Sequence, residues 1–531
     1  MMGAFPKQRV GASTARGEYA LSPVQERMVM GRALAQVGSS EAPTSTVLLG
    51  LRQSGDFALP IVLRALNEIV RRHPCLAVSI VPNPTIPASE LRAGILKYGN
   101  GAFDPGFYVQ RPIPGARVTV RRIALSHMDP TGRDTEFRSI VQEERLRPFD
   151  YQTPPLMRGT LVEFGDREHV LLVSVDHIVS DGWSLRIISR EFKALYECFT
   201  SGNRDLPNEA PVSYLDYVEW QHETNRNGCF AREATYWREK WRTFASQRIA
   251  VRDLPFAVQT GEPSLRQEDL STSFSLEESQ SLRAFSCQRK VTLYMCFLAA
   301  FAILMRLYIG REQIAIWTYC YNRVRPEIQN VIGYFVNRHL IGLDVNSNLS
   351  AAALLHYVRA VVCETMTHQE MPLDFLWQML RCRPRFFDAN VNLGFRRTDQ
   401  TVEEAGTPLL GQGISDIKLP VTNLPGVTGL GVLVEDNGLT LSMHCRYSAD
   451  RYPEGAIEQM LRDLRAILTE MVQFPEAAVS RYSTLIHQWP QPRSTKREQM
   501  GEFILLNSDL IPEVHVARVA SSCRRSEEFE V

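Results

Sequence analysis

The clearest pattern in the chain is an apolar run followed directly by an amphipathic one. Residues 167–177, REHVLLVSVDH, are rich in consecutive valine and leucine, which is typical of a β-strand covered on both faces. Residues 184–199, SLRIISREFKALYECF, then place five apolar side chains on one helical face: Leu185, Ile188, Phe192, Leu195 and Phe199. The pattern predicts a buried strand, a tight turn and a helix.

A second apolar run, VTLYMCFLAAFAILM, covers residues 291–305 and is ended by Arg306. A helix that crosses a membrane needs about 20 apolar residues, so this run is too short to span one. We therefore expect a helix buried in a protein core.

The predicted turn carries the residues with chemical potential. Asp181, Gly182 and Ser184 have turn and N-cap chemistry, because a short polar side chain accepts from the free amides of a first helical turn and glycine tolerates unusual backbone angles. Successive side chains of a strand point to opposite faces, so of Asp176 and His177 one should face a site and the other the packing. A histidine at a strand end is commonly structural, and this pattern alone leaves its role open.

The length and the composition of the chain limit which folds and which binding partners are possible. A chain of 531 residues exceeds the ~250–300 residues at which single cores stop growing, which predicts two lobes. The 59 basic and 59 acidic residues leave no net charge, which argues against nucleic acid as a partner. The ten cysteines show no C-x-x-C pair or metal-ligand spacing, and we expect reduced thiols in a cytoplasmic protein without a metal.

The two ends of the chain differ from its middle. Residues 1–18 are small and basic and lack the apolar segment of a signal peptide, which indicates a flexible tail. QWPQPRSTKREQ, residues 488–499, has the composition of a linker, so residues 487–531 are predicted to be a linker and a C-terminal tail.

The tract HIVSDGWS, residues 177–184, resembles the active-site signature H-H-x-x-x-D-G-W-S of the condensation domains of nonribosomal peptide synthetases. That family belongs to a superfamily of CoA- and carrier-dependent acyltransferases. Six further segments are similar to the family's other signatures, in the family's order: LSPVQERM (21–28), RRHPCL (71–76), RPFDYQTPPLMRG (147–159), SYLDYVEWQ (213–221), NVIGYFVNRH (330–339) and THQEMPLD (367–374). The resemblance covers about residues 20–485.

This resemblance implies an α/β fold of two lobes, each a sandwich like chloramphenicol acetyltransferase, set in a V with a central tunnel. We place the N-terminal lobe, with the catalytic motif, at residues 19–203 and the C-terminal lobe at residues 204–486. The resemblance also implies that carrier proteins approach opposite mouths of the tunnel. Their phosphopantetheine arms would then deliver the substrates, so the chain needs no cofactor of its own.

The implied reaction transfers an acyl group from a carrier-protein thioester to an amine, or less often an alcohol, in natural-product biosynthesis. The thioester is already activated, so the protein must orient the nucleophile and remove its proton, and a positioned base contributes ~10²–10⁴ in rate. His177 aligns with the second histidine of the signature and is the expected catalytic residue, as a base or as a positioning group.

The resemblance also assigns roles around His177. Asp181 and Gly182 are expected to be architectural, with Asp181 paired to an arginine for which Arg71 and Arg72 are candidates. Five residues are expected along the substrate tunnel: Asp176, Trp183, Ser184, Asn337 and Arg338. Arg338 stands where the family commonly has threonine.

Asp176 replaces the first histidine of the signature and opens two alternatives. With Asp181 and Ser184 it fits D-x-x-x-x-D-x-x-S, the signature of heterocyclisation domains, which form thiazoline or oxazoline rings. The retained His177 and the IGYFVN segment favour the amide-forming type. The second alternative is a non-catalytic domain that docks carrier proteins. Because no adenylation or carrier signature is present, we expect a freestanding monomer that acts on carrier-bound or free small acceptors.

Overall fold

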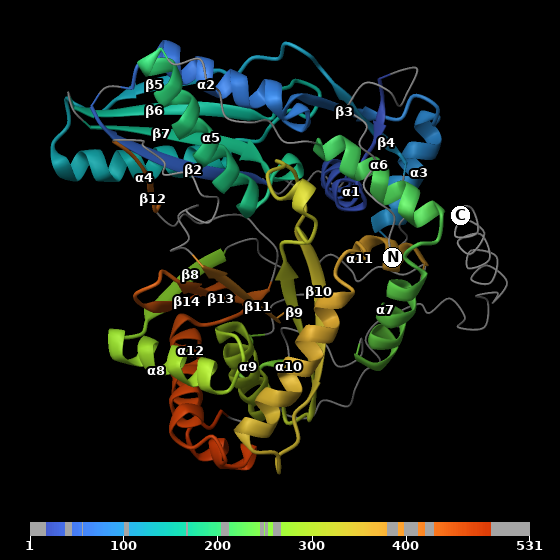
Figure 1. Ribbon diagram of the computed structural model, residues 1–531, viewed down its shortest axis with the longest axis vertical. Coiled ribbons are helices and arrows are strands. Elements are labelled where there is room, and N and C mark those ends of the chain that lie inside the picture. Colours follow the sequence, from blue (N-terminus) through green and yellow to red (C-terminus); the bar gives the residue numbers. More distant parts are fainter. Residues whose placement is uncertain are drawn as a thin grey trace, which may run out of the picture.

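The computed structural model describes residues 17–37, 45–55, 57–99, 106–165, 168–202, 212–244, 249, 253–258, 267–379, 391–397, 413–419 and 429–489. Two α/β lobes lie one above the other in Figure 1, the upper built mainly from the first half of the chain and the lower from the second. The predicted two-lobed α/β fold is confirmed. The predicted lobe boundary after residue 203 and almost all of both predicted tails lie outside the described residues.

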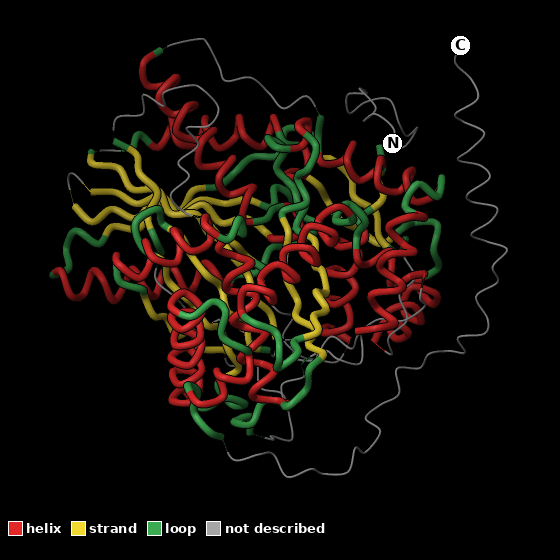
Figure 2. The backbone as a smooth tube through the Cα atoms, turned by 60° about the horizontal axis from the view of Figure 1, so that its bottom comes forward, coloured by secondary structure: helices red, strands yellow, loops and turns green. Residues whose placement is uncertain are grey.

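The main sheet of the first half has the strand order β12-β2-β7-β6-β5. Four strands come from the first half: β2 (Thr46–Ser54), β5 (Val120–Ala124), β6 (Met157–Gly165) and β7 (Glu168–Asp176). Helices α2 (Leu59–Arg72) and α5 (Gly182–Ser201) pack together on one face, and α4 (Pro130–Leu146) covers the other. In Figure 2 these strands fan out on the left of the molecule.

Strand β7 is buried on both faces, as its composition predicts. Leu171, Val173 and Val175 belong to the core under α2 and α5, whereas Val170 and Leu172 pack with α4, and all five are fully buried. The predicted helix is α5, with Ile188, Phe192 and Leu195 buried and Leu185 and Phe199 partly buried against the same core. The strand, the turn and the helix are therefore confirmed.

A smaller antiparallel sheet lies beside this one, with the order β1-β4-β3. Its strands are β1 (Tyr19–Ala20), β3 (Val78–Pro82) and β4 (Tyr108–Pro112). Helices α1 (Pro23–Val37) and α3 (Ala88–Gly99) pack together next to it, and the 3₁₀ turn η1 (Pro74–Ala77) links α2 to β3.

The second half builds a six-stranded sheet with the order β10-β9-β11-β13-β14-β8. The strands are β8 (Gln267–Ser273), β9 (Gln313–Cys320), β10 (Asn337–Asp344), β11 (Val391–Arg397), β13 (Leu430–Asp436) and β14 (Leu441–Ser448). Its core is shared with α8 (Leu276–Gln288), α9 (Leu293–Ile309), α10 (Ala351–Thr367), α12 (Glu454–Gln473) and the 3₁₀ turn η7 (Val479–Thr484).

Helix α9 contains the long apolar run, and every residue from Met295 to Met305 is buried. The prediction of a core helix is confirmed. Among the described residues no single helix has the length and apolarity to cross a membrane, although α8 and α9 together, bent by 100°, satisfy the length and composition test.

Several elements join the two lobes. Strand β12 (Ile414–Ile417) pairs antiparallel with β2 and so extends the sheet of the first half. Helix α6 (Tyr214–Arg226) contacts β1 and η1, and α11 (Leu373–Met379) contacts α1, while α7 (Ala231–Phe244) packs on β9 and β10. The connection between β9 and β10 also rises toward the upper lobe (yellow in Figure 1). The site described next lies where these elements meet.

Candidate active site

His177 follows β7 directly and begins the short 3₁₀ turn η2 (His177–Val179). The ring is partly exposed, in contrast to the fully buried β7. Its Nδ1 lies 2.6 Å from the carbonyl oxygen of Ser180. Because a carbonyl only accepts, Nδ1 must carry the proton, and Nε2 keeps a free lone pair. The turn thus fixes the position of the Nδ1 proton and leaves Nε2 as the ring atom that can act as a base.

The His177 ring faces Tyr334, which lies on the connection between β9 and β10. The two ring centroids are 4.8 Å apart and the rings are tilted by 37°. Tyr334 comes from the second half of the chain, and so His177 sits at the contact between the lobes. Burial raises the pKa of the Tyr334 phenol, and the charges of Arg27 and Arg338 oppose that rise.

Asp176 is 1% exposed, in contrast to the partly exposed His177. Its Oδ1 accepts from the Ser45 hydroxyl at 2.8 Å and from the Ile178 amide at 2.9 Å, so it caps the η2 turn. Burial raises the pKa of this carboxyl. The expectation that Asp176 lines a substrate tunnel is therefore wrong, because its side chain is occupied inside the first lobe.

Asp181 is completely buried and caps α5, accepting from the Ser184 amide at 2.8 Å. Its Oδ1 also lies 3.2 Å from Nη2 of Arg323, and its Oδ2 accepts from the Phe335 amide at 3.1 Å. The predicted architectural role and arginine partner are present. The identity of that arginine was predicted wrongly, since Arg71 and Arg72 both bond to Glu68 on α2 instead.

The other members of the turn also have structural positions. Ser184 is fully buried and donates to the carbonyl of Gly333 at 2.8 Å, so it does not line a tunnel as expected. Gly182 is exposed, has no positive φ, and has open space where a Cβ would stand. The conformational freedom of glycine is therefore not used there.

Trp183 is partly exposed and connects α5 to the second half. Its Nε1 donates to the carbonyl of Gln329 at 2.9 Å, and its ring centroid lies 5.4 Å from that of Tyr321. This position at the lobe contact is compatible with the predicted place beside substrate.

Asn337 and Arg338, the two other predicted tunnel residues, behave differently from each other. The Asn337 side chain is buried and binds the carbonyls of Gln369 and Met371 and the amide of Leu373, so it holds that loop in place. Arg338 is partly exposed and lines a pocket. Asn337 lines the same pocket, but its side-chain amide is already hydrogen-bonded, whereas the Arg338 guanidinium has no hydrogen-bond partner among the described residues.

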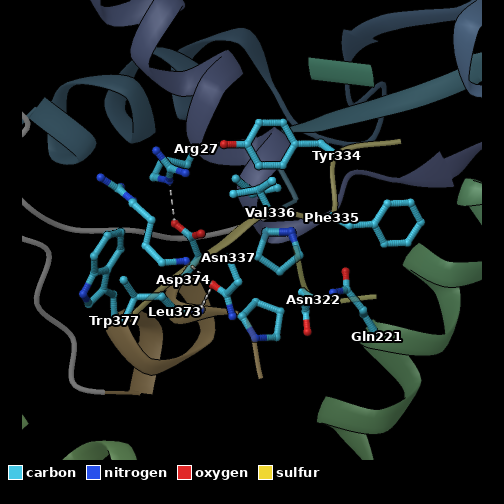
Figure 3. Close-up of a pocket in the computed structure, with 14 residues that line it drawn as sticks. Arg27, Gln221, Asn322, Tyr334, Phe335, Val336, Asn337, Leu373, Asp374 and Trp377 are labelled. Carbon is cyan, nitrogen blue, oxygen red and sulfur yellow. Dashed lines mark hydrogen bonds and ion pairs between the residues drawn. The ribbon is translucent and has the colours of Figure 1, made fainter. Parts of the chain in front are cut away.

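The pocket lies between α1, α6, β10 and α11 (Figure 3). It is lined by Tyr334, whose ring also contacts His177. Arg27 on α1 donates to Asp374 on α11 at 2.8 Å across it, and this pair joins the two halves. Its polar lining also includes Gln221, Asn322 and Tyr334. None of these residues was singled out individually from the sequence, although all of them except Asn322 lie inside the family-like segments 21–28, 213–221, 330–339 and 367–374.

The other family-like segments also converge on this region. Tyr214, in segment 213–221, has its hydroxyl 2.9 Å from the carbonyl of Tyr334. Its ring lies so close to Gly333 that a Cβ there would stand 2.1 Å from it, and so this position requires glycine. Cys75, in segment 71–76, donates from Sγ to the carbonyl of Ile332 at 3.1 Å. Residues that are far apart in the sequence are thus packed around one connection.

Comparison with known proteins agrees with this arrangement. The chain is 27% identical over 487 residues to a linear gramicidin synthase of Brevibacillus parabrevis, covering 89% of this chain and 9% of that protein. It is 26% identical over 426 residues to chondramide synthase cmdD of Chondromyces crocatus, covering 80% and 10% respectively. The chain thus spans a tenth or less of these two relatives.

Solved structures share the fold. The X-domain from teicoplanin biosynthesis superposes with a TM-score of 0.71 at 16% identity, covering 89% of this chain and 99% of that one. The SgcC5 protein of Streptomyces globisporus gives a TM-score of 0.66 at 18% identity, covering 86% and 100%. The family model described as the condensation domain matches residues 104–489, most of the chain. This protein belongs to the condensation-domain family of the nonribosomal peptide synthetases.

Proposed function

We propose that the chain transfers an acyl group from a carrier-protein thioester to an amine, with His177 as the base and an alcohol as the less favoured acceptor. The observation that carries the proposal is the imidazole itself. It is partly exposed at the lobe contact, its Nδ1–H is held by Ser180, and Nε2 has no partner among the described residues.

In the proposed step the acceptor nitrogen attacks the thioester carbonyl, forming a C–N bond while the C–S bond breaks. Nε2 of His177 takes the proton that the nitrogen loses and passes it to the departing sulfur, which leaves as the thiol of the phosphopantetheine arm. That arm belongs to the carrier protein and enters as part of the substrate. Holding both substrates at one lobe contact also lowers the entropic barrier.

The test uses the full chain with a carrier protein that has been loaded with an acyl group, and follows the amide product by mass spectrometry. We expect His177→Ala to lower the rate by ~10²–10⁴. His127→Ala removes an exposed histidine of the loop that precedes α4 and serves as the matched control. Undiminished turnover in His177→Ala would contradict the base role.

Heterocyclisation is less well supported, because the three side chains that suggested it are all buried and hydrogen-bonded within the fold. Asp176, Asp181 and Ser184 are 0–1% exposed and hydrogen-bonded within the fold. The same mass spectra decide the matter, since a cyclised product is lighter by one water than the amide.

A non-catalytic docking role has one observation in its favour. The X-domain from teicoplanin biosynthesis, solved in complex with OxyB, superposes with a TM-score of 0.69. Carrier binding without turnover of any acyl donor would support docking over catalysis. The free Nε2 of His177 favours catalysis.

A further inference from the structure

Among the described residues, the pocket near His177 has one positive charge without an acidic partner. Its charged lining residues among those described are Arg27, Arg338 and Asp374. Arg27 and Asp374 form an ion pair of 2.8 Å whose side chains are 13% and 6% exposed, so they neutralise each other. The charge of Arg338 remains.

The Arg338 guanidinium has no acidic or carbonyl partner in the described part of the chain. It lies 5.9 Å from the ring centroids of both Trp317 and Trp377, which hold it by cation–π contacts. Such contacts leave the five N–H donors of the guanidinium available. An arginine held in place with free donors is arranged to bind a planar anion in bidentate fashion.

Two amide side chains in the same pocket are also incompletely bonded. Gln221 and Asn322 are each 4% exposed, and their Oε1 and Oδ1 atoms have no hydrogen-bond partner among the described residues. Their amide nitrogens both bond to the Tyr217 hydroxyl. Figure 3 places these two side chains across the pocket from Arg27 and Trp377. Since buried polar atoms are rarely left unpaired, they mark positions for polar groups of a ligand.

The size and the position of the pocket restrict the kinds of ligand that can bind there. The cavity volume is about 30 Å³, and because one water needs about 10–15 Å³ of such space, it accommodates a group of about two oxygen atoms. Tyr334 lines the pocket and also contacts the His177 ring. A small anionic group bound there would be close to the proposed reaction centre.

We propose that this pocket selects a small acceptor that bears a carboxylate, such as a free amino acid, and that Arg338 is the residue that binds it. The inference rests on the proposed function. The carboxylate occupies the pocket and pairs with Arg338, and the rest of the acceptor, with its nucleophile, extends from the pocket toward the contact between Tyr334 and His177. Arg338 is thus a specificity-determining residue.

The kinetic test compares free amino acids with the corresponding primary amides as acceptors, using an acyl-loaded carrier as donor. In the wild type we expect the carboxylates to be the better acceptors. Arg338→Gln should raise KM for carboxylates by about 10- to 100-fold, the effect of losing a charged hydrogen-bond pair, and leave the amides unchanged. Arg338→Lys should restore part of the preference. Arg359→Gln, at an exposed site on α10, is the control.

A binding test separates this inference from the proposed reaction. Saturation-transfer NMR with a pool of amino acids and a pool of their amides requires no acyl donor. Contacts to carboxylates that disappear in Arg338→Gln and persist in Arg359→Gln support the inference even if no acyl transfer occurs. Equal signals from carboxylates and amides would overturn it. The third probe is pantetheine 4′-phosphate. If the binding of this probe alone depended on Arg338, the assignment of the pocket to an acceptor carboxylate would be overturned.

Discussion

Two polar regions at the lobe contact differ in how completely their polar side chains are hydrogen-bonded. At the start of α5, both oxygens of Asp181 are occupied, by Arg323, by Ser184 and by the Phe335 amide. In the pocket, Arg338 and the amide oxygens of Gln221 and Asn322 have no such partners among the described residues. Arg323 and Phe335 belong to the connection between β9 and β10, and Asn322 and Arg338 lie on or beside it, so the difference is local.

This difference in hydrogen bonding distinguishes residues that hold the two lobes together from residues that are available to bind a ligand. A buried charge is costly unless it is paired, so the Asp181–Arg323 pair should contribute strongly when one partner is removed. Polar groups that have no partner among the described residues, such as the Arg338 guanidinium, should contribute less to stability and more to binding. The predictions below test this division, from the largest expected effect to the smallest.

Asp181→Ala should be the most damaging substitution. It leaves Arg323, whose side chain is 3% exposed, without its carboxylate, and breaking a buried pair costs about 3–5 kcal/mol of the free energy of unfolding. Denaturant unfolding measures this loss. The control is Asp134→Ala, which breaks an exposed pair with Arg138 and should cost less than about 1 kcal/mol. Equal losses in both variants would contradict the division.

Glu26 should make stability depend on pH. Burial raises the pKa of this 2% exposed carboxyl from 4.5 to about 8. Between these values Glu26 holds a proton in the folded protein that it has lost in the unfolded chain, so its own contribution to stability should fall by about 1.4 kcal/mol per pH unit as pH rises, relative to the Glu26→Gln variant. Glu26→Gln keeps the acceptor for the Phe107 amide and should remove this slope. Unfolding curves measured across this pH range test it, with Glu90→Gln, at an exposed site, as control.

Asp176→Ala should have an intermediate effect. It leaves the Ser45 hydroxyl and the Ile178 amide without their acceptor, and an unsatisfied buried group costs about 1–3 kcal/mol. Asp176→Asn keeps an acceptor oxygen and should lose less. Thermal unfolding of the two variants gives the comparison, and the opposite order would contradict the role of Asp176 as a hydrogen-bond acceptor in the turn.

Arg71→Ala should have the smallest effect. Its side chain is 57% exposed and pairs with Glu68 on its own helix, and such pairs contribute about 0–1 kcal/mol. Arg323→Met, which leaves Asp181 without its arginine, is the comparison variant and should be far less stable in the same denaturant titration. A large loss of stability in Arg71→Ala would instead support Arg71 as the structural arginine.

The local features of the site were predictable from sequence, because neighbouring residues determine them. The alternation along β7, the spacing along α5 and the cap at Asp181 depend on residues within a few positions of one another. The partner of Asp181 was not predictable in this way, since Arg323 lies 142 residues further along the chain. Tyr334, Gln221 and Asn322 reach the pocket only through the packing of the lobes, and no periodic pattern marks them.

The position of β12 has a consequence for how the protein is made. Strands β2, β5, β6 and β7 are complete once residue 176 has been synthesised, but the strand that covers the outer edge of β2 is residues 414–417. Synthesis proceeds at ~5–20 residues per second, so that edge stays uncovered for some time while the ribosome makes most of the second half. An uncovered edge is a template for wrong pairing. The nascent first lobe is therefore the stage at which this chain most needs protection from aggregation.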